Sequence, residues 1–129
     1  MVKIKMMRFA EKTCVVTASA TGIGKAIATR LASEGGKVVI SSRNQEHIDE
    51  VVNELKQKGY EAAGKVCHVG KAEDREGLVK FAVETFGGID VLVNNAAVST
   101  YMGATVETTE VAMDKMYEVN IKSALVLTN

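Results

Sequence analysis

A run of small residues at positions 17–24 has the composition and the setting of a phosphate-binding loop. It reads Thr-Ala-Ser-Ala-Thr-Gly-Ile-Gly and joins a β-branched run to an amphipathic stretch. Glycines let the backbone approach a pyrophosphate, and the free amide groups and dipole of a helix start favour negative charge. Gly22 and Gly24 fit these two roles, so the loop predicts a dinucleotide site. The alternative is a small-residue turn that binds nothing.

The end of the next β-branched run indicates which nicotinamide cofactor would fit. In dinucleotide-binding folds, a carboxylate at this place holds the ribose hydroxyls and repels a 2′-phosphate, whereas an arginine accommodates the phosphate. Here the run ends in Ser41-Ser42-Arg43, without a carboxylate. We therefore expect NADP(H), with Arg43 as the main phosphate ligand and Ser42 assisting. A solvated arginine at a helix start is the alternative. No basic residue precedes Gly22 in the loop, so a second phosphate contact is missing there.

These residues must be positioned by alternating strands and helices. Strands are predicted at 13–17, 37–42, 63–69 and 89–94, and helices at 22–34, 45–58, 71–86 and from about residue 109. The second and fourth runs are almost continuously apolar, which is typical of strands covered on both faces. Right-handed crossovers give the strand order 3-2-1-4. The sequence predicts an α/β fold, a Rossmann-type doubly wound parallel sheet that stops after about four strands, as one incomplete domain over 1–129. Its nucleotide would bind at the switch point after the first strand.

Each predicted helix carries an apolar stripe with a period near 3.6 residues. On the first helix the stripe is Ile23, Ala26, Ile27 and Leu31, and on the second it is Ile48, Val51, Val52 and Leu55. The third helix is expected to bury Leu78, Val79, Ala82, Val83 and Phe86. On the fourth, Asn120 shares a stripe with Met113, Met116, Ala124 and Leu127, which predicts a buried amide that needs partners.

Two motifs make the sequence similar to the short-chain dehydrogenase/reductase family over about residues 11–128. Residues 16–24 resemble its Thr-Gly-x-x-x-Gly-x-Gly fingerprint, with Ala18 replacing the first glycine. Residues 94–97 resemble its Asn-Asn-Ala-Gly motif, with Ala97 in place of glycine. Each alanine costs on the order of 1 kcal/mol only where the backbone needs a positive φ. The loop residues that the resemblance assigns to the cofactor are Thr17, Ala18, Ser19, Thr21, Gly22, Ile23 and Gly24.

Residues 66–75 and 41–43 are similar to a narrower branch of this family, the NADPH-dependent carbonyl and retinal reductases, whose mammalian members are peroxisomal tetramers. His68 and Val69 stand where the family usually has an aspartate-valine pair beside the adenine. His68 would then donate to the base, or it is a partly exposed histidine at a strand end. Asn95 and Ala96 follow the fourth strand at the switch point and would line the ribose and nicotinamide side. Asn94 and Asn95 would alternatively only tie loop backbone groups together.

One catalytic residue of the family is matched. Its helix carries a Val-Asn pair whose asparagine holds a water in the proton relay, and Val119-Asn120 fits this pattern. An amide that caps neighbouring backbone is the alternative for Asn120. The family also uses a serine and a Tyr-x-x-x-Lys pair. The residues four positions after Tyr60, Tyr101 and Tyr117 are Gly64, Thr105 and Ile121, so no tyrosine has its lysine.

Bulk properties narrow the function classes. The 16 basic and 16 acidic residues balance, which argues against nucleic acid and anionic membranes as partners. Residues 1–12 contain no apolar run long enough for a signal peptide, so we expect a cytoplasmic chain with no membrane partner. Cys14 and Cys67 should lie roughly 9 to 10 Å apart across one intervening strand. That separation is too large for a disulfide. No metal site is predicted.

These expectations combine into one leading function. The chain is expected to be the cofactor-binding part of an NADP(H)-dependent oxidoreductase that reduces ketones, aldehydes or retinal, with a carbonyl substrate and a homo-tetramer in a parent protein that is peroxisomal. The apolar helical pattern at 121–129 and the apolar strand edge at 89–93 predict a truncated piece. The family resemblance implies that this piece is inactive alone, because the serine and the Tyr-x-x-x-Lys pair are missing. The alternative is a catalytically inactive nucleotide-binding or interaction module. A nucleotide-fold methyltransferase is disfavoured, because such sites usually want an acidic residue where this strand ends in Ser42-Arg43.

Overall fold

The computed structural model describes residues 7–129. Residues 1–6, which belong to the predicted domain and to the opening segment 1–12, lie outside the described residues. The strands are β1 (Thr13–Val16), β2 (Lys37–Ser42), β3 (Ala62–Val66) and β4 (Val91–Val93). The helices are α1 (Gly22–Ser33), α2 (Gln45–Gln57), α3 (Ala72–Phe86), α4 (Glu110–Tyr117) and α5 (Ser123–Thr128), with η1 (Thr105–Glu107) and η2 (Glu118–Lys122) before and after α4.

The four strands form one parallel sheet in the order β3-β2-β1-β4, as predicted. The predicted third strand runs three residues too far, because β3 stops at Val66, opposite Ser42 at the end of β2. After Val66 the chain turns, and the backbone N–H of His68 donates to Oδ2 of Asp74 at 2.8 Å. The fourth strand is shorter than predicted at both ends. At its start, the side chain of Asp90 accepts from the backbone N–H of Thr13 at 2.8 Å, which leaves that N–H unavailable for strand pairing.

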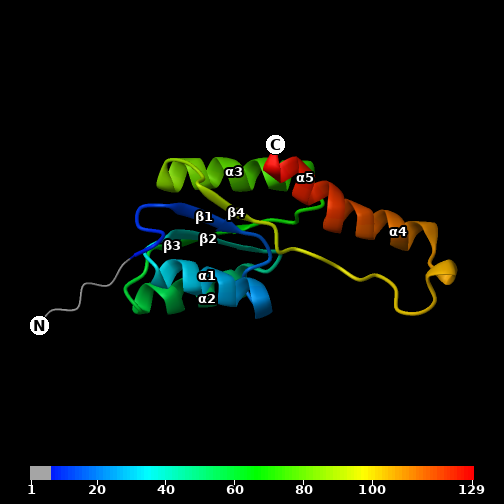
Figure 1. Cartoon of the computed structure of the whole chain (residues 1–129), viewed down its shortest axis with the longest axis horizontal. Coiled ribbons are helices and arrows are strands. Elements are labelled where there is room, and N and C mark those ends of the chain that lie inside the picture. Colours follow the sequence, from blue (N-terminus) through cyan, green and yellow to red (C-terminus); the bar gives the residue numbers. More distant parts are fainter. Residues whose placement is uncertain (1–6) are drawn as a thin grey trace, which may run out of the picture.

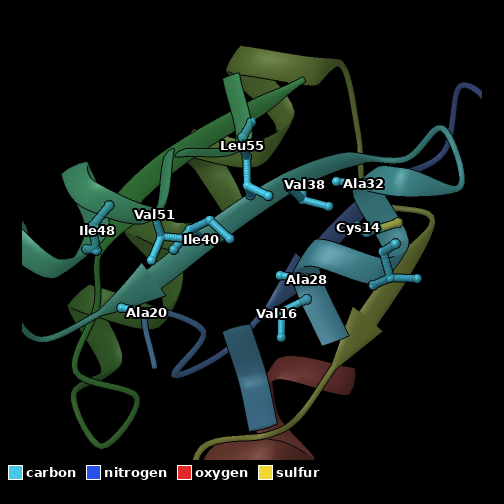
Figure 2. Close-up of a cluster of buried hydrophobic side chains, with 12 residues drawn as sticks. Cys14, Val16, Ala20, Ala28, Ala32, Val38, Ile40, Ile48, Val51 and Leu55 are labelled. Carbon is cyan, nitrogen blue, oxygen red and sulfur yellow. The ribbon is translucent and has the colours of Figure 1, made fainter. Parts of the chain in front are cut away.

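Helices cover both faces of the sheet (Figure 1), with α1 and α2 on one side and α3 and α5 on the other. Alternate strand residues point to opposite faces, as the strand period requires. Val16, Val38 and Ile40 pack against the α1 and α2 side in the cluster that Figure 2 shows. Val15 and Val39 pack with Leu78 and Ala82 of α3 on the other side. The inference that the second strand is covered on both faces is therefore confirmed, whereas the residues of β4 are only half-buried.

The apolar stripe predicted for α2 is confirmed, whereas those of α1 and α3 are partly wrong. Ile48, Val51 and Leu55 are buried in α2. In α1 the buried residues are Gly24, Ala28, Leu31 and Ala32, and Ile23 is 76% exposed. The stripe is displaced because small residues allow α1 to lie close to the loop and the sheet. In α3, Leu78 and Ala82 are buried, but Val79 and Val83 are exposed.

The predicted single fourth helix is three helical segments. Thr109 caps α4 by accepting from the backbone N–H of Ala112 at 3.2 Å. The five residues of η2 then form a π-helical turn, after which α5 continues. Such a turn changes which side chains share a face. Val119 and Ser123 are consequently the buried residues, whereas Asn120 and Met113 are exposed, contrary to the predicted stripe.

The last third of the chain is more open than the rest. In Figure 1 the yellow-to-orange segment after β4 leaves the sheet, and α4 projects beyond the ends of the strands. No residue of α4 is buried. Within the described sheet, β4 is an edge strand that pairs only with β1. Among residues 7–129, no helix is long and apolar enough to cross a membrane.

Candidate functional site

A pocket of about 180 Å³ lies at the carboxyl ends of β1, β2 and β3. This is the edge of an open parallel sheet at which ligands bind. It is enclosed by the loop after β1, by the residues after β2, β3 and β4, and by α4 and η2. The lining residues are Ala18, Ala20, Thr21, Ser42, Arg43, Cys67, His68, Val69, Ala96, Ala97, Val98, Lys115 and Val119.

The loop between β1 and α1 is held in a tight turn. Ala18 has φ +50° and Gly22 has φ +55°. A Cβ on Gly24 would lie 2.4 Å from the carbonyl oxygen of Ala18 and 2.5 Å from Nδ2 of Asn95, so only glycine fits there. Thr21, the N-cap of α1, makes no side-chain capping hydrogen bond, and the first turn holds no acidic residue. The first N–H groups of a helix lack intrahelical partners, so this end can receive an anion.

Thr17 and Asn95 fasten this loop to the residues after β4. The Oγ1 of Thr17 accepts from the backbone N–H groups of Asn95 at 3.0 Å and of Ala96 at 2.9 Å. The Nδ2 of Asn95 donates to the carbonyl oxygens of Thr17 and Ala18, both at 3.1 Å. The side chain of Asn95 therefore ties loop backbone groups together, as the alternative interpretation of this residue expects.

Ser19 fastens the same loop to β2. Its side chain is fully buried, and its Oγ donates to the carbonyl oxygen of Val16 at 2.8 Å. The same Oγ accepts from the backbone N–H of Ser41 at 3.0 Å. The hydroxyl of Ser19 thus both donates and accepts a hydrogen bond inside the protein. Ser19 therefore stabilises the loop, and it is not among the residues that line the pocket.

The end of β2 presents Ser42 and Arg43 to the pocket. The Oγ of Ser42 accepts from the backbone N–H of Asn44 at 3.2 Å, which leaves its own hydrogen free to donate. Asn44 in turn caps α2 by accepting from the N–H groups of Glu46 and His47. Arg43 is exposed and forms no ion pair within residues 7–129. Its guanidinium is therefore available to an anionic ligand.

His68 is held in the turn between β3 and α3. Its Nδ1 accepts from the backbone N–H of Gly70 at 3.0 Å, and its Nε2 lies 3.3 Å from Nζ of Lys115 on α4. Partial burial lowers the pKa of His68, and the positive charges of Lys115, Arg43 and Lys71 lower it further. A neutral imidazole is therefore favoured at neutral pH.

Asn120 lies in the π-helical turn and uses both ends of its amide on one backbone position. The Oδ1 accepts from the N–H of Val98 at 2.7 Å, and Nδ2 donates to the carbonyl oxygen of Val98 at 2.8 Å. This double contact anchors the loop after β4 to η2. Asn120 therefore caps neighbouring backbone groups, as the alternative interpretation of this residue expects. Its role in a proton relay stays a prediction.

The structure brings together about half of the predicted cofactor-binding residues. Those that line the pocket are Ala18, Thr21, Ser42, Arg43, His68, Val69 and Ala96, whereas Thr17, Ser19, Gly22, Ile23, Gly24 and Asn95 shape the loop beside it. The sequence reasoning missed Val98, which lies in the loop after β4, and Lys115, which reaches the pocket only because α4 and η2 bring the chain back beside that loop. Asn120, which pairs with Val98, was the sequence signal that could have pointed to this return.

Both cysteines are free, as predicted, and both are buried. Cys14 packs on the α1 side of the sheet and Cys67 on the α3 side. Burial raises the pKa of the Cys67 thiol to about 11, with a further contribution from Asp74. Burial, and to a smaller extent Asp90, also raises the pKa of the Cys14 thiol, so neither thiol is a nucleophile at neutral pH.

Comparison with known proteins gives one consistent result. The family model described as short chain dehydrogenase matches residues 12–129. Dehydrogenase/reductase SDR family member 4 of Sus scrofa is 51% identical over 117 residues, which cover 91% of this chain and 42% of that protein. Tropinone reductase-like 3 of Erythroxylum coca is 48% identical over 120 residues, which cover 93% of this chain and 46% of that protein.

A solved structure supports the same relationship. A variant of a Serratia marcescens short-chain dehydrogenase/reductase superposes with a TM-score of 0.87 at 31% sequence identity. The match covers 93% of this chain and 49% of that one. The chain thus spans less than half the length of the relatives to which it is similar.

Proposed function

The chain belongs to the short-chain dehydrogenase family, and from this premise we propose that it is the cofactor-binding part of an NADP(H)-dependent oxidoreductase that reduces carbonyl compounds. Members of this family use nicotinamide cofactors. The substrates that we propose for the whole protein are ketones, aldehydes or retinal. The name of one relative, tropinone reductase-like 3, supports reduction as the direction, and that of the other, a dehydrogenase/reductase, is compatible with it.

The backbone groups and the charges beside the pocket support a dinucleotide as its ligand. The start of α1, which has no side-chain cap, offers N–H groups to a pyrophosphate. Beside it, the absence of a side chain on Gly24 lets the helix start pack closely against Ala18 and Asn95. Ala96 and Val98 would border the nicotinamide side, and Ser42 and Arg43 the adenosine ribose. When bound, the cofactor would supply the hydride. Residues of this chain would hold the cofactor and orient it against the switch point between β1 and β4.

The choice of NADP(H) over NAD(H) is carried by one observation. The pocket is lined at the end of β2 by Ser42 and Arg43, and none of its lining residues is a carboxylate. A guanidinium on a phosphate forms charge-assisted hydrogen bonds worth roughly 1.5 to 3 kcal/mol, about ten- to hundredfold in affinity. A carboxylate that would hold the ribose hydroxyls of NAD(H) is missing from this position.

The test is a titration of the purified chain with NADPH and with NADH. We expect NADPH to bind at least tenfold more tightly, and Arg43→Ala to remove most of that difference. Lys56→Ala, on the far part of α2, is the matched control that removes a positive charge outside the pocket. Gly24→Val should abolish binding of both cofactors, because its side chain would collide with Ala18 and Asn95. Equal affinities for the two cofactors would overturn the proposal.

A further inference from the structure

Two side chains that are distant in sequence meet at the edge of the pocket. His68 comes from the turn after β3 and Lys115 from α4, and their Nε2 and Nζ atoms are 3.3 Å apart. Both residues line the same pocket as Ser42 and Arg43. Their contact is therefore part of the candidate nucleotide site.

The protonation of the His68 ring follows from its other contact. A backbone N–H can only donate, so Nδ1 accepts from Gly70, and a neutral imidazole then carries its proton on Nε2. The lowered pKa of His68 favours that neutral form. A lysine ammonium is also a donor and has no lone pair. The Nε2–H of His68 and the Nζ–H groups of Lys115 are thus two donors directed at the same region.

The backbone fixes the position of the ring. A Cβ on Gly70 would lie 2.9 Å from Cε1 of His68, so the missing side chain of Gly70 makes room for the imidazole. The N–H of His68 is held by Asp74 at 2.8 Å. These contacts within the turn hold the ring so that Nε2 faces the pocket, whereas the longer side chain of Lys115 can change its rotamer to contact a ligand.

The charge around these donors selects an anion. Lys115 and Arg43 form no ion pair within residues 7–129. No carboxylate lines the pocket. An oxygen that carries negative charge can accept from both donors and offset the repulsion among the cations, whereas a neutral donor group, such as an exocyclic amine, cannot.

We propose that Lys115 and the Nε2–H of His68 bind an oxygen of the phosphate on the adenosine ribose, as a second phosphate contact beside Arg43. This inference rests on the proposed function, since it requires an NADP(H)-type ligand. It accounts for the loop of residues 17–24 having no basic residue, because the second cation comes from α4. Discrimination between the two cofactors is then shared by the end of β2 and by α4, two elements that are far apart in the sequence.

The test compares two small ligands that differ only in the 2′-phosphate, adenosine 2′,5′-bisphosphate and adenosine 5′-monophosphate. Binding to the full chain is measured by calorimetry. Lys115→Met should weaken binding of the bisphosphate at least tenfold and leave the monophosphate unchanged. His68→Phe should act in the same direction. Lys115→Arg should keep most of the preference, and Lys80→Met, which removes a lysine of α3 outside the pocket, should have no effect.

The outcomes separate this inference from the function on which it rests. If the unaltered chain binds both ligands equally, the preference for NADP(H) fails and this inference fails with it. If the unaltered chain prefers the bisphosphate but Lys115→Met leaves that preference intact, only this inference is overturned. Equal weakening of both ligands by Lys115→Met overturns it too, because Lys115 would then contact the base or another shared group. Thermal melting of each variant checks that the fold is kept.

Discussion

At the scale of single residues, the two alanines that replace family glycines have different consequences. Ala18 adopts φ +50°, a left-handed conformation that a Cβ disfavours. Ala97 is not among the described residues with positive φ. The sequence alone showed that both glycines were replaced, but only the backbone shows that one replacement is strained and the other is not.

We therefore expect Ala18→Gly to stabilise the chain by about 1 kcal/mol, because glycine relieves the strain at positive φ. Ala97→Gly is the matched control, and it should be neutral or slightly destabilising, since glycine only adds freedom to the unfolded chain there. Urea unfolding followed by circular dichroism measures both. Equal effects of the two substitutions would show that the conformation of Ala18 is not the cause.

The sequence predicted which residues lie at the candidate site better than it predicted what their side chains contact. The place of Arg43 after a β-branched run predicts its role, the match of His68 to a family motif predicts that of His68, and both residues line the pocket. Thr17 and Ser19 were named from a motif, yet their hydroxyls are used inside the protein. A motif records which residues a loop needs, and it does not separate those that touch a ligand from those that hold the loop.

At the scale of elements, the strand order was predictable because parallel strands with short crossover helices admit few topologies. Helix faces were less predictable. Ile23 fits the period of the α1 stripe, but it lies in the first turn, beyond the cover of the sheet. The π-helical turn at Glu118–Lys122 has no marker in the sequence, because no proline or glycine is needed to form it.

The end of α1 gives a prediction about pH. Glu34 is the C-cap of α1, and Nη2 of Arg8 donates to it at 2.9 Å. The hydrogen bond from Arg8 and its charge lower the pKa of Glu34 to about 2, with help from Arg30 and against the effect of burial. The folded state thus favours the ionised form more than the unfolded state does, where a glutamate titrates near pH 4.3. The resulting stabilisation is present above about pH 4.3 and is lost as the pH falls towards 2.

We accordingly expect Glu34→Gln to be less stable than the unaltered chain at pH 7, with the gap closing between about pH 5 and pH 2. The measurement is the urea midpoint of each protein at a series of pH values. Glu76→Gln, on the exposed side of α3 and without an ion pair among residues 7–129, is the control and should show no such gap. A gap of constant size across the pH range would mean that the charge of Glu34 is not what stabilises the helix end.

At the scale of the whole molecule, the described sheet has an apolar strand at one edge. β4 pairs with β1 alone, and its residues Val91, Leu92 and Val93 are only half-buried. A groove beside it is lined by Val79, Ile89 and Leu127. An edge strand with unpaired backbone groups is prone to pair with another chain. The relatives are more than twice as long as the part that this chain matches, so they have further sequence with which to cover such an edge.

The last prediction is that this chain binds the cofactor without turning over substrate. Reduction of a carbonyl needs a proton for the substrate oxygen, and a positioned general acid typically contributes 10²–10⁴-fold in rate. Tyr60 packs against the core, Tyr117 is exposed, and neither is followed four residues later by a lysine. Tyr101 donates to Glu107 at 3.0 Å, and that hydrogen bond raises the pKa of Tyr101, which weakens it as an acid.

NADPH oxidation by the purified chain should therefore be undetectable with diketones, aromatic ketones and retinal, and light scattering should report self-association through the β4 edge. A version extended with the remaining sequence of a relative should be active and of defined size, which is the matched control. The same preparations should bind NADPH, so that loss of turnover is not mistaken for loss of the fold. A monodisperse monomer of the 129-residue chain that reduces any of these compounds at an enzyme-like rate would contradict the prediction, because the proton would then have to come from a group other than these three tyrosines.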